Sequence, residues 1–133
     1  MVTIDKFENW NKLKQEIHFG EQNNKNPKYG EIWNIYNGIN IGYESIGKGD
    51  KYERPVLVLK KLGQIYLCIT MTTKGKDNNI FYYKLNNNYF NKKSYLTLSQ
   101  GKCIDGKRFI KKIGELSHRD LFLIKKEIIN LWF

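Results

Sequence analysis

Cysteine and histidine are scarce in this 133-residue sequence, which contains two of each. Neither type occurs in a C-x-x-C pair or in another spacing that is typical of a zinc site. Cys68 lies within the apolar segment IYLCIT, so we expect it to be a small buried hydrophobic residue. The sequence therefore does not indicate a zinc-binding protein.

Long apolar runs are absent as well, and no segment is long enough to cross a bilayer as a helix. The first residues, MVTIDKFENW, contain acidic side chains and lack the apolar centre of a signal peptide. We therefore expect a cytoplasmic protein without a membrane segment, and the low cysteine content fits that compartment.

Arginine is also rare: Arg54, Arg108 and Arg119 are the only ones, although Lys and Arg together number 23 against 13 Asp and Glu. The formal net charge of +10 attracts polyanions, and phosphate contacts dominate the affinity of proteins for nucleic acids. A second explanation stays open, because an A/T-rich genome favours Lys, Asn and Ile without selection for function. The charge suggests a nucleic-acid partner without establishing one.

The N-terminal segment is predicted to form a helix over residues 3–19. Phe7, Trp10, Leu13 and Ile17 recur at helical spacing and form one apolar face. A polar linker containing glycine and proline follows over residues 20–30. We expect an N-terminal helical extension and linker over residues 1–28 and one domain over residues 29–133, a length that suits a single core.

Short strands are predicted for most of the remaining chain. They cover residues 31–36, 55–71 (two strands joined at Leu62-Gly63-Gln64), 79–85, 94–100 and 110–113. Ser117 and Asp120 begin a capping box in front of a C-terminal helix. The pattern predicts a mainly β, α+β fold: a small β-barrel with an N-terminal helical extension and a C-terminal helix.

A glycine-rich basic segment, GYESIGKG, precedes the second strand and nearly spells a phosphate-binding P-loop. Gly49 stands where that motif needs Ser or Thr, and a strand follows where it needs a helix, so nucleotide binding is rejected. The segment is then either a solvated hairpin loop or a mobile cover over a phosphate site.

Arg54 favours the phosphate site. Pro55 holds Arg54 in an extended conformation at the start of an apolar strand, where its planar fork can bind a phosphate at two points. Thr72, Thr73 and Lys74 follow the next strand. If the two strands pair through the Gly63 turn, Arg54 and Thr72 are neighbours and can stabilise a pentacoordinate phosphate.

Four segments, in this order, resemble the PemK/MazF family of toxin endoribonucleases: GEIWNI, INIGYESIGKGDKYERPVLVL, LCITMTTK and LSQGKCIDGKRFIKKIGEL. The similarity runs from Tyr29 to the C-terminus. It implies a homodimeric SH3-like barrel that cleaves single-stranded RNA at short sequences without a metal or other cofactor. In this family the ribose 2′-hydroxyl attacks the phosphorus, which leaves a 2′,3′-cyclic phosphate and a 5′-hydroxyl.

The same resemblance implies roles for individual residues. Arg54 matches the catalytic arginine, Thr72 the catalytic threonine, and Glu44 a loop glutamate that could accept the proton. Ser99 stands where some members carry a carboxylate, and lysine occurs where arginine is usual at Lys102. The residues expected to bind RNA are Ser45, Lys48, Lys51, Thr73, Lys74, Gln100 and Lys102.

A toxin of this kind needs an inhibitor, and the charge of +10 favours an acidic antitoxin protein as partner. Two alternatives stay open: a non-catalytic SH3-like module that binds nucleic acid or protein, and a toxin homologue that has lost activity.

Overall fold

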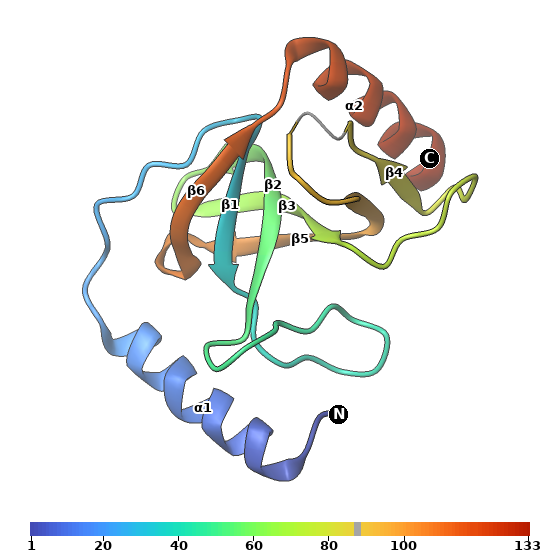
Figure 1. Ribbon diagram of the computed structural model, residues 1–133. Coiled ribbons are helices and arrows are strands. Elements are labelled where there is room, and N and C mark those ends of the chain that lie inside the picture. Colours follow the sequence, from blue (N-terminus) through green and yellow to red (C-terminus); the bar gives the residue numbers. More distant parts are fainter. Residues whose placement is uncertain (87–88) are drawn as a thin grey trace.

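The computed structural model describes residues 1–86 and 89–133, which form six strands and two α-helices (Figure 1). The elements are α1 (Ile4–Phe19), β1 (Glu31–Tyr36), β2 (Glu53–Leu62), β3 (Ile65–Thr72), β4 (Tyr82–Lys84), β5 (Tyr95–Asp105), the 3₁₀ turn η1 (Gly106–Arg108), β6 (Phe109–Glu115) and α2 (His118–Trp132). Within this described part of the chain, neither helix is long and apolar enough to span a membrane.

The strands form one antiparallel sheet in the order β4-β5-β3-β2-β1-β6. The expectation of a mainly β, α+β fold is confirmed. In the described residues β4 and β6 are the two edges and do not pair, so the sheet is open. Closure into an SH3-like barrel is therefore not confirmed.

Apolar residues fill both faces of the sheet because the strands alternate between two cores. On one face Ile32 and Leu57 join Leu121 and Ile124 of α2. On the other face the sheet curls over its own side chains, where the Phe109 ring lies edge-on to its aromatic neighbours. The second core contains Trp33, Ile35, Val56, Val58, Tyr66, Cys68, Ile104 and Phe109.

The predicted hairpin between β2 and β3 is confirmed. Gly63 occupies the turn with a φ of +70°, a conformation that favours glycine. The register pairs Val56 with Thr70, so the start of β2 lies beside the end of β3. Arg54 and Thr72 are thereby brought to the same edge of the molecule.

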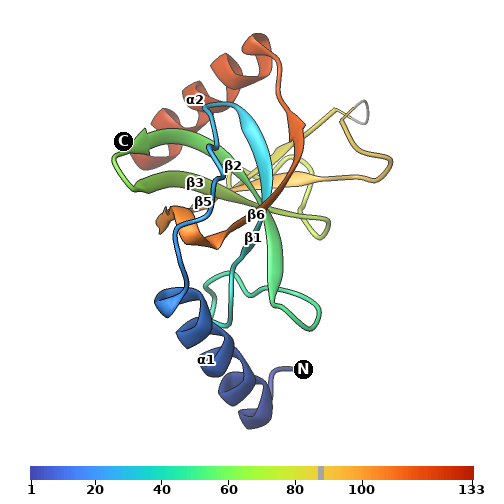
Figure 2. The same ribbon diagram turned by 90° about the vertical axis from the view of Figure 1, so that its left-hand side faces the viewer.

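Helix α2 begins at the predicted cap, where the Ser117 hydroxyl accepts the N–H of Asp120 at 3.2 Å. Leu121 and Ile124 are buried against the sheet. Near the end of the helix, Trp132 is 43% exposed, but its indole N–H donates to the Leu98 carbonyl at 2.9 Å. The helix therefore covers one face of the sheet, as Figure 2 shows.

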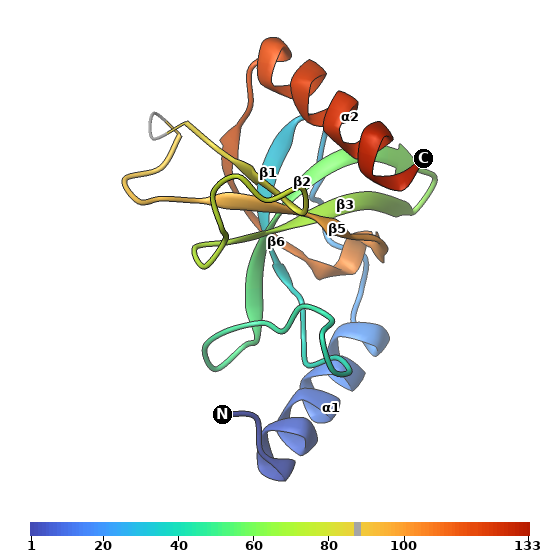
Figure 3. The ribbon, with the colours of Figure 1, turned by 90° about the vertical axis from the view of Figure 1, so that its right-hand side faces the viewer.

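Helix α1 packs away from this core, beside the loop that joins β1 and β2 (Figures 1 and 3). Trp10 is its one buried residue, and it lies in a small cluster with Ile39 and Tyr52. The rings of Trp10 and Tyr52 meet edge-on with centroids 5.9 Å apart. The predicted apolar face of the helix thus packs on the loop. Phe7, in the first turn of the helix, is 45% exposed.

Candidate functional site

Arg54, the second residue of β2, is held by backbone carbonyls on two sides. Its Nε and Nη2 donate to the Ile46 carbonyl at 2.9 and 2.6 Å, and its Nη1 donates to the Met71 carbonyl at 2.9 Å. Burial lowers the pKa of Arg54. The guanidinium is therefore fixed between the β1–β2 loop and the end of β3.

A pocket of about 310 Å³ opens at this guanidinium. It combines hydroxyl, amide, carboxylate and cationic groups with a few apolar walls. Its lining residues are Asn34, Lys48, Glu53, Arg54, Pro55, Met71, Thr72, Thr73, Phe90, Lys92, Ser94 and Ile113. We call it the Arg54 pocket.

Thr72 is half-buried in this pocket at the end of β3. Its Oγ1 accepts the backbone N–H of Lys74 at 3.1 Å, which fixes the side chain. Because an accepted bond does not use the hydroxyl proton, Thr72 can still donate it to a ligand oxygen. The predicted neighbours Arg54, Thr72 and Thr73 therefore line one pocket.

Cations surround the Arg54 pocket and make it a strongly positive region. The pKa of Lys48 is lowered by burial and then by the charges of three neighbours: Arg54, Lys74 and Lys92. Like charges gathered this closely disfavour one another unless an anion joins them. The pocket is therefore suited to phosphate groups.

The β1–β2 loop is more firmly held than its glycine-rich sequence suggests. Lys48 and Glu53 exchange two backbone hydrogen bonds of 2.8 and 2.9 Å, and Gly47 donates to the Gly38 carbonyl at 2.7 Å. A Cβ at Gly47 would lie 1.8 Å from the Tyr52 carbonyl oxygen, so this close approach requires glycine. Mobility of the loop stays a prediction.

Three residues predicted to bind RNA take part in hydrogen bonds that hold this loop and do not line the Arg54 pocket: Ser45, Gln100 and Lys102. Gln100 accepts the Ser45 N–H at 3.2 Å and donates to the Tyr43 carbonyl at 2.9 Å. The Lys102 ammonium donates to the buried Asn37 side chain, which donates to the Ser45 hydroxyl at 3.1 Å.

Lys102 is itself an unusual group in this network. Burial, followed by the charge of Arg108, lowers the pKa of Lys102 to about 8. Arg108 is anchored close by, since its Nη1 donates to the Tyr36 carbonyl at 2.8 Å. Lys102 and Arg108 thus hold the start of the β1–β2 loop, where it leaves β1.

Glu44 and Lys51 lie outside the Arg54 pocket. The Glu44 side chain is exposed, and its Oε1 accepts the N–H of Ile41 at 3.2 Å within the same loop. Lys51 is exposed at the other end of the loop. The structure therefore does not bring Glu44 together with Arg54 and Thr72.

Glu53 is the carboxylate that the sequence interpretation missed. Of the described residues that line the Arg54 pocket, it alone carries a carboxylate. Its Oε1 accepts from the Asn34 amide at 2.6 Å, which orients it. Glu53 directly precedes Arg54 in the sequence. Because neighbouring residues of a strand point to opposite faces of the sheet, this position alone does not predict a carboxylate beside the guanidinium. In the structure both residues line the Arg54 pocket.

A family model described as the PemK-like, MazF-like toxin of type II toxin–antitoxin systems matches residues 28–132. No curated protein sequence is significantly similar to the chain.

Solved structures share its fold at low identity. MazF (Form-I) from Deinococcus radiodurans has a TM-score of 0.65 and 16% identity, covering 80% of this chain and 96% of that chain. The MazE–MazF complex (Form-III) of that organism has a TM-score of 0.57 and 15% identity, covering 80% of this chain and 95% of that chain. An endoribonuclease in complex with its cognate antitoxin from a mycobacterial species has a TM-score of 0.59 and 11% identity, covering 79% of this chain and 93% of that chain.

At these identities the structural similarities establish the fold, whereas the family model spans most of the sequence. Its match begins at the linker and includes the β1–β2 loop, Arg54 and Thr72. The chain therefore belongs to the PemK-like, MazF-like family of type II toxins.

Proposed function

We propose that this toxin is an endoribonuclease that cuts single-stranded RNA at short sequences without a metal ion. The observation that carries the proposal is the fixed guanidinium of Arg54 beside Thr72 in a positively charged pocket. The family resemblance supplies the reaction class.

Arg54 is the proposed phosphate-binding group. A guanidinium has about five N–H donors, and the bonds to Ile46 and Met71 use three of them. One donor on each terminal nitrogen is left for the scissile phosphate, as bidentate binding requires. Thr72 would donate a further hydrogen bond to the same phosphate.

In the proposed reaction the ribose 2′-oxygen forms a bond to phosphorus while the bond from phosphorus to the 5′-oxygen breaks. The products are a 2′,3′-cyclic phosphate and a 5′-hydroxyl, so the 2′-hydroxyl loses a proton to an acceptor, and the leaving 5′-oxygen takes one from the Arg54 guanidinium, which regains it from water. We assign the proton acceptor to Glu53 because it lines the pocket, in place of Glu44, which lies outside it.

The proposed partners follow from charge and from the relatives. Two of the similar structures contain an antitoxin, and a chain of net charge +10 suits an acidic antitoxin of its own. We also propose a homodimer that works in the cytoplasm, with an SH3-like barrel over residues 29–133 and the extension over residues 1–28.

The test is to incubate the purified protein with a long RNA, with and without EDTA, and to map the cut ends. We expect cleavage in both samples, with cyclic phosphate and 5′-hydroxyl ends, and none at a site carrying 2′-deoxyribose. Loss of cleavage in EDTA that magnesium restores would overturn the mechanism. RNA that is bound and left uncut would favour the non-catalytic module or the inactive homologue.

A further inference from the structure

A second pocket, of about 720 Å³, lies between helix α1 and the β1–β2 loop. The N-terminal segment contributes Val2, Lys6 and Asn9 to its wall, and the loop contributes Ile39, Ile46, residues 47–50 and Tyr52. Lys48 lines both this pocket and the Arg54 pocket. The two pockets are therefore neighbours that share one cation.

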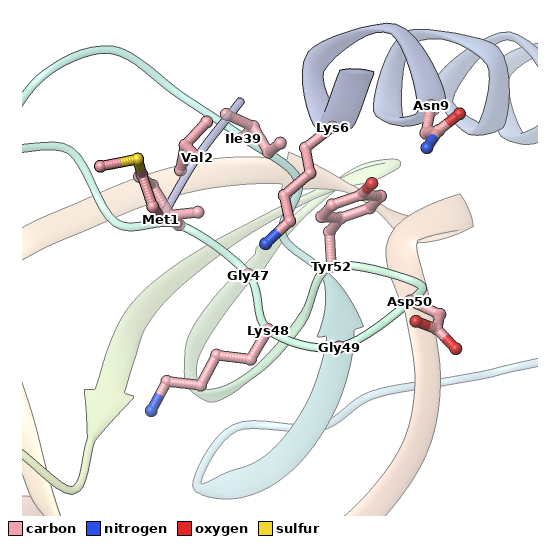
Figure 4. Close-up of a pocket in the computed structure, with 11 residues that line it drawn as sticks. Met1, Val2, Lys6, Asn9, Ile39, Gly47, Lys48, Gly49, Asp50 and Tyr52 are labelled. Atoms are coloured by element: carbon pink, nitrogen blue, oxygen red, sulfur yellow. The ribbon is translucent and has the colours of Figure 1, made fainter. Parts of the chain in front are cut away.

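The charged groups of this second pocket are separated in space. Figure 4 shows the Lys6 and Lys48 ammonium groups on one side, and Asp50 and Asn9 on the other. In this view the Tyr52 ring lies between the two groups, and the apolar side chains of Val2 and Ile39 lie together on the side of the lysines. Among the described residues, the Lys6 ammonium has no ion-pair partner.

We propose that this pocket is a subsite for a nucleotide that flanks the cut in the RNA substrate, a proposal that rests on the endoribonuclease function above. The flanking phosphate binds between Lys6 and Lys48. The base lies against the apolar wall, where Asn9 and Asp50 accept hydrogen bonds from its amino or imino groups. A nucleotide is complementary to this arrangement, because its phosphate is anionic and its base carries hydrogen-bond donors.

The size and the charge of the pocket both favour this occupant. Its volume is within the range of about 300–1,000 Å³ that small-molecule sites occupy. Arg54 lines one pocket, Lys6 lines the other and Lys48 lines both, so RNA that extends from the first pocket into the second would have a cation for its phosphates in each.

Helix α1 supplies the part of this subsite that lies outside the segment matched by the family model. Lys6 and Asn9 lie in residues 4–19, outside the segment 28–132 that the family model matches. We infer that the extension lengthens the RNA-binding surface beyond that of the matched domain.

The experiment measures binding of single-stranded RNA that carries 2′-deoxyribose at the mapped cut site. One oligonucleotide extends several nucleotides to each side of the cut, and the other keeps one nucleotide on each side. The variant is Lys6→Ala, and the matched control is Lys12→Ala, which removes an exposed lysine of the same helix that lines neither pocket.

We expect Lys6→Ala to weaken binding of the long oligonucleotide by about fivefold and to reduce the slope of log K against log salt by about 0.7, as for one phosphate contact. Binding of the short oligonucleotide should be unchanged, and Lys12→Ala should match the wild type on both. Equal behaviour of Lys6→Ala and Lys12→Ala on the long oligonucleotide would overturn the subsite.

Two further outcomes separate this inference from the proposed function. If the wild type cuts no RNA, the same comparison is made with an uncut mixed-sequence RNA. A loss specific to Lys6→Ala then supports the subsite although the enzyme assignment has failed. If Lys6→Ala weakens capture of the antitoxin and leaves RNA binding unchanged, the pocket belongs to the protein partner and the RNA subsite is wrong.

Discussion

At the scale of single residues, Arg54 combines two properties that lysine cannot supply. Its guanidinium is anchored by the Ile46 and Met71 carbonyls and still presents two free donors on one plane. A lysine ammonium keeps the charge but has no planar fork, so it cannot do both at once.

We therefore expect Arg54→Lys to lower RNA cleavage by about a hundredfold, similar to removal of one oxyanion donor. The loss in RNA affinity should be smaller because the charge is kept. The measurement is the single-turnover cleavage rate together with the dissociation constant. Arg119→Lys, which changes an exposed arginine on α2, is the matched control. Equal rates for the two variants would mean that Arg54 is only a surface charge.

Glu53 and Glu44 give a second test at this scale, since they are the two candidates for the proton acceptor. We expect Glu53→Gln to lower cleavage by about a hundredfold, the usual range for loss of a general base. Glu44→Gln should have a small effect because its carboxylate caps the Ile41 N–H. The measurement is the cleavage rate of both variants across pH. A larger loss in Glu44→Gln than in Glu53→Gln would show that the loop glutamate is the base.

The proximity of Arg54 and Thr72 could be predicted from the sequence, because a hairpin turn fixes the register of the strands on either side of it. Their catalytic roles stay a prediction, and the residues that surround them could not be predicted. Gln100 and Lys102 hold the loop from β5, more than fifty residues away. No local pattern shows such a contact.

At the scale of elements, helix α1 supports the β1–β2 loop from outside the sheet. The Trp10 ring covers Gly38, where a Cβ would lie 2.2 Å from the indole. Ile46, whose carbonyl holds Arg54, is partly buried in the same cluster. The helix therefore connects to the Arg54 pocket through the loop.

Truncation of this indole should loosen the loop. We expect Trp10→Ala to cost about 3 kcal/mol of unfolding free energy, at the lower end for a buried tryptophan, because its cluster is small. Amide hydrogen exchange at Gly47, Lys48 and Glu53 should become faster, whereas the amides of β3 keep their protection.

The matched control is Phe7→Ala, which removes an aromatic ring from the exposed end of the same helix face. Unchanged exchange at the three loop amides in Trp10→Ala would show that the helix does not support the loop.

The elements themselves were largely predictable, and their arrangement was less so. Helical spacing placed α1 within one residue, and the Ser117 cap placed the start of α2. Periodicity shows that a helix has an apolar face but not what that face covers. Closure of the sheet depends on how its edge strands meet, and turn signals carry no information on that.

At the scale of the whole molecule, the net charge of +10 attracts polyanions, and both proposed partners, RNA and an acidic antitoxin, are polyanions. In our proposal both bind at the Arg54 pocket and its lysines, so an acidic protein that fills this pocket would exclude RNA from it.

We expect the acidic product of a neighbouring gene to inhibit RNA cleavage in a competition assay, with weaker inhibition at higher salt. The measurement is the cleavage rate at increasing antitoxin concentration under several ionic strengths. Tight binding of that product without any effect on cleavage would contradict the shared pocket.

The bonds from Arg54 to the Ile46 carbonyl have a kinetic consequence. These bonds join the loop backbone to the guanidinium, so a ligand that moves the loop would also move the proposed phosphate-binding group, even when RNA stays bound. Such a ligand lowers the turnover number at saturating RNA, whereas one that only occupies the pocket raises the Michaelis constant. The steady-state inhibition pattern of an antitoxin therefore distinguishes an antitoxin that moves the loop at Ile46 from one that covers the Arg54 guanidinium.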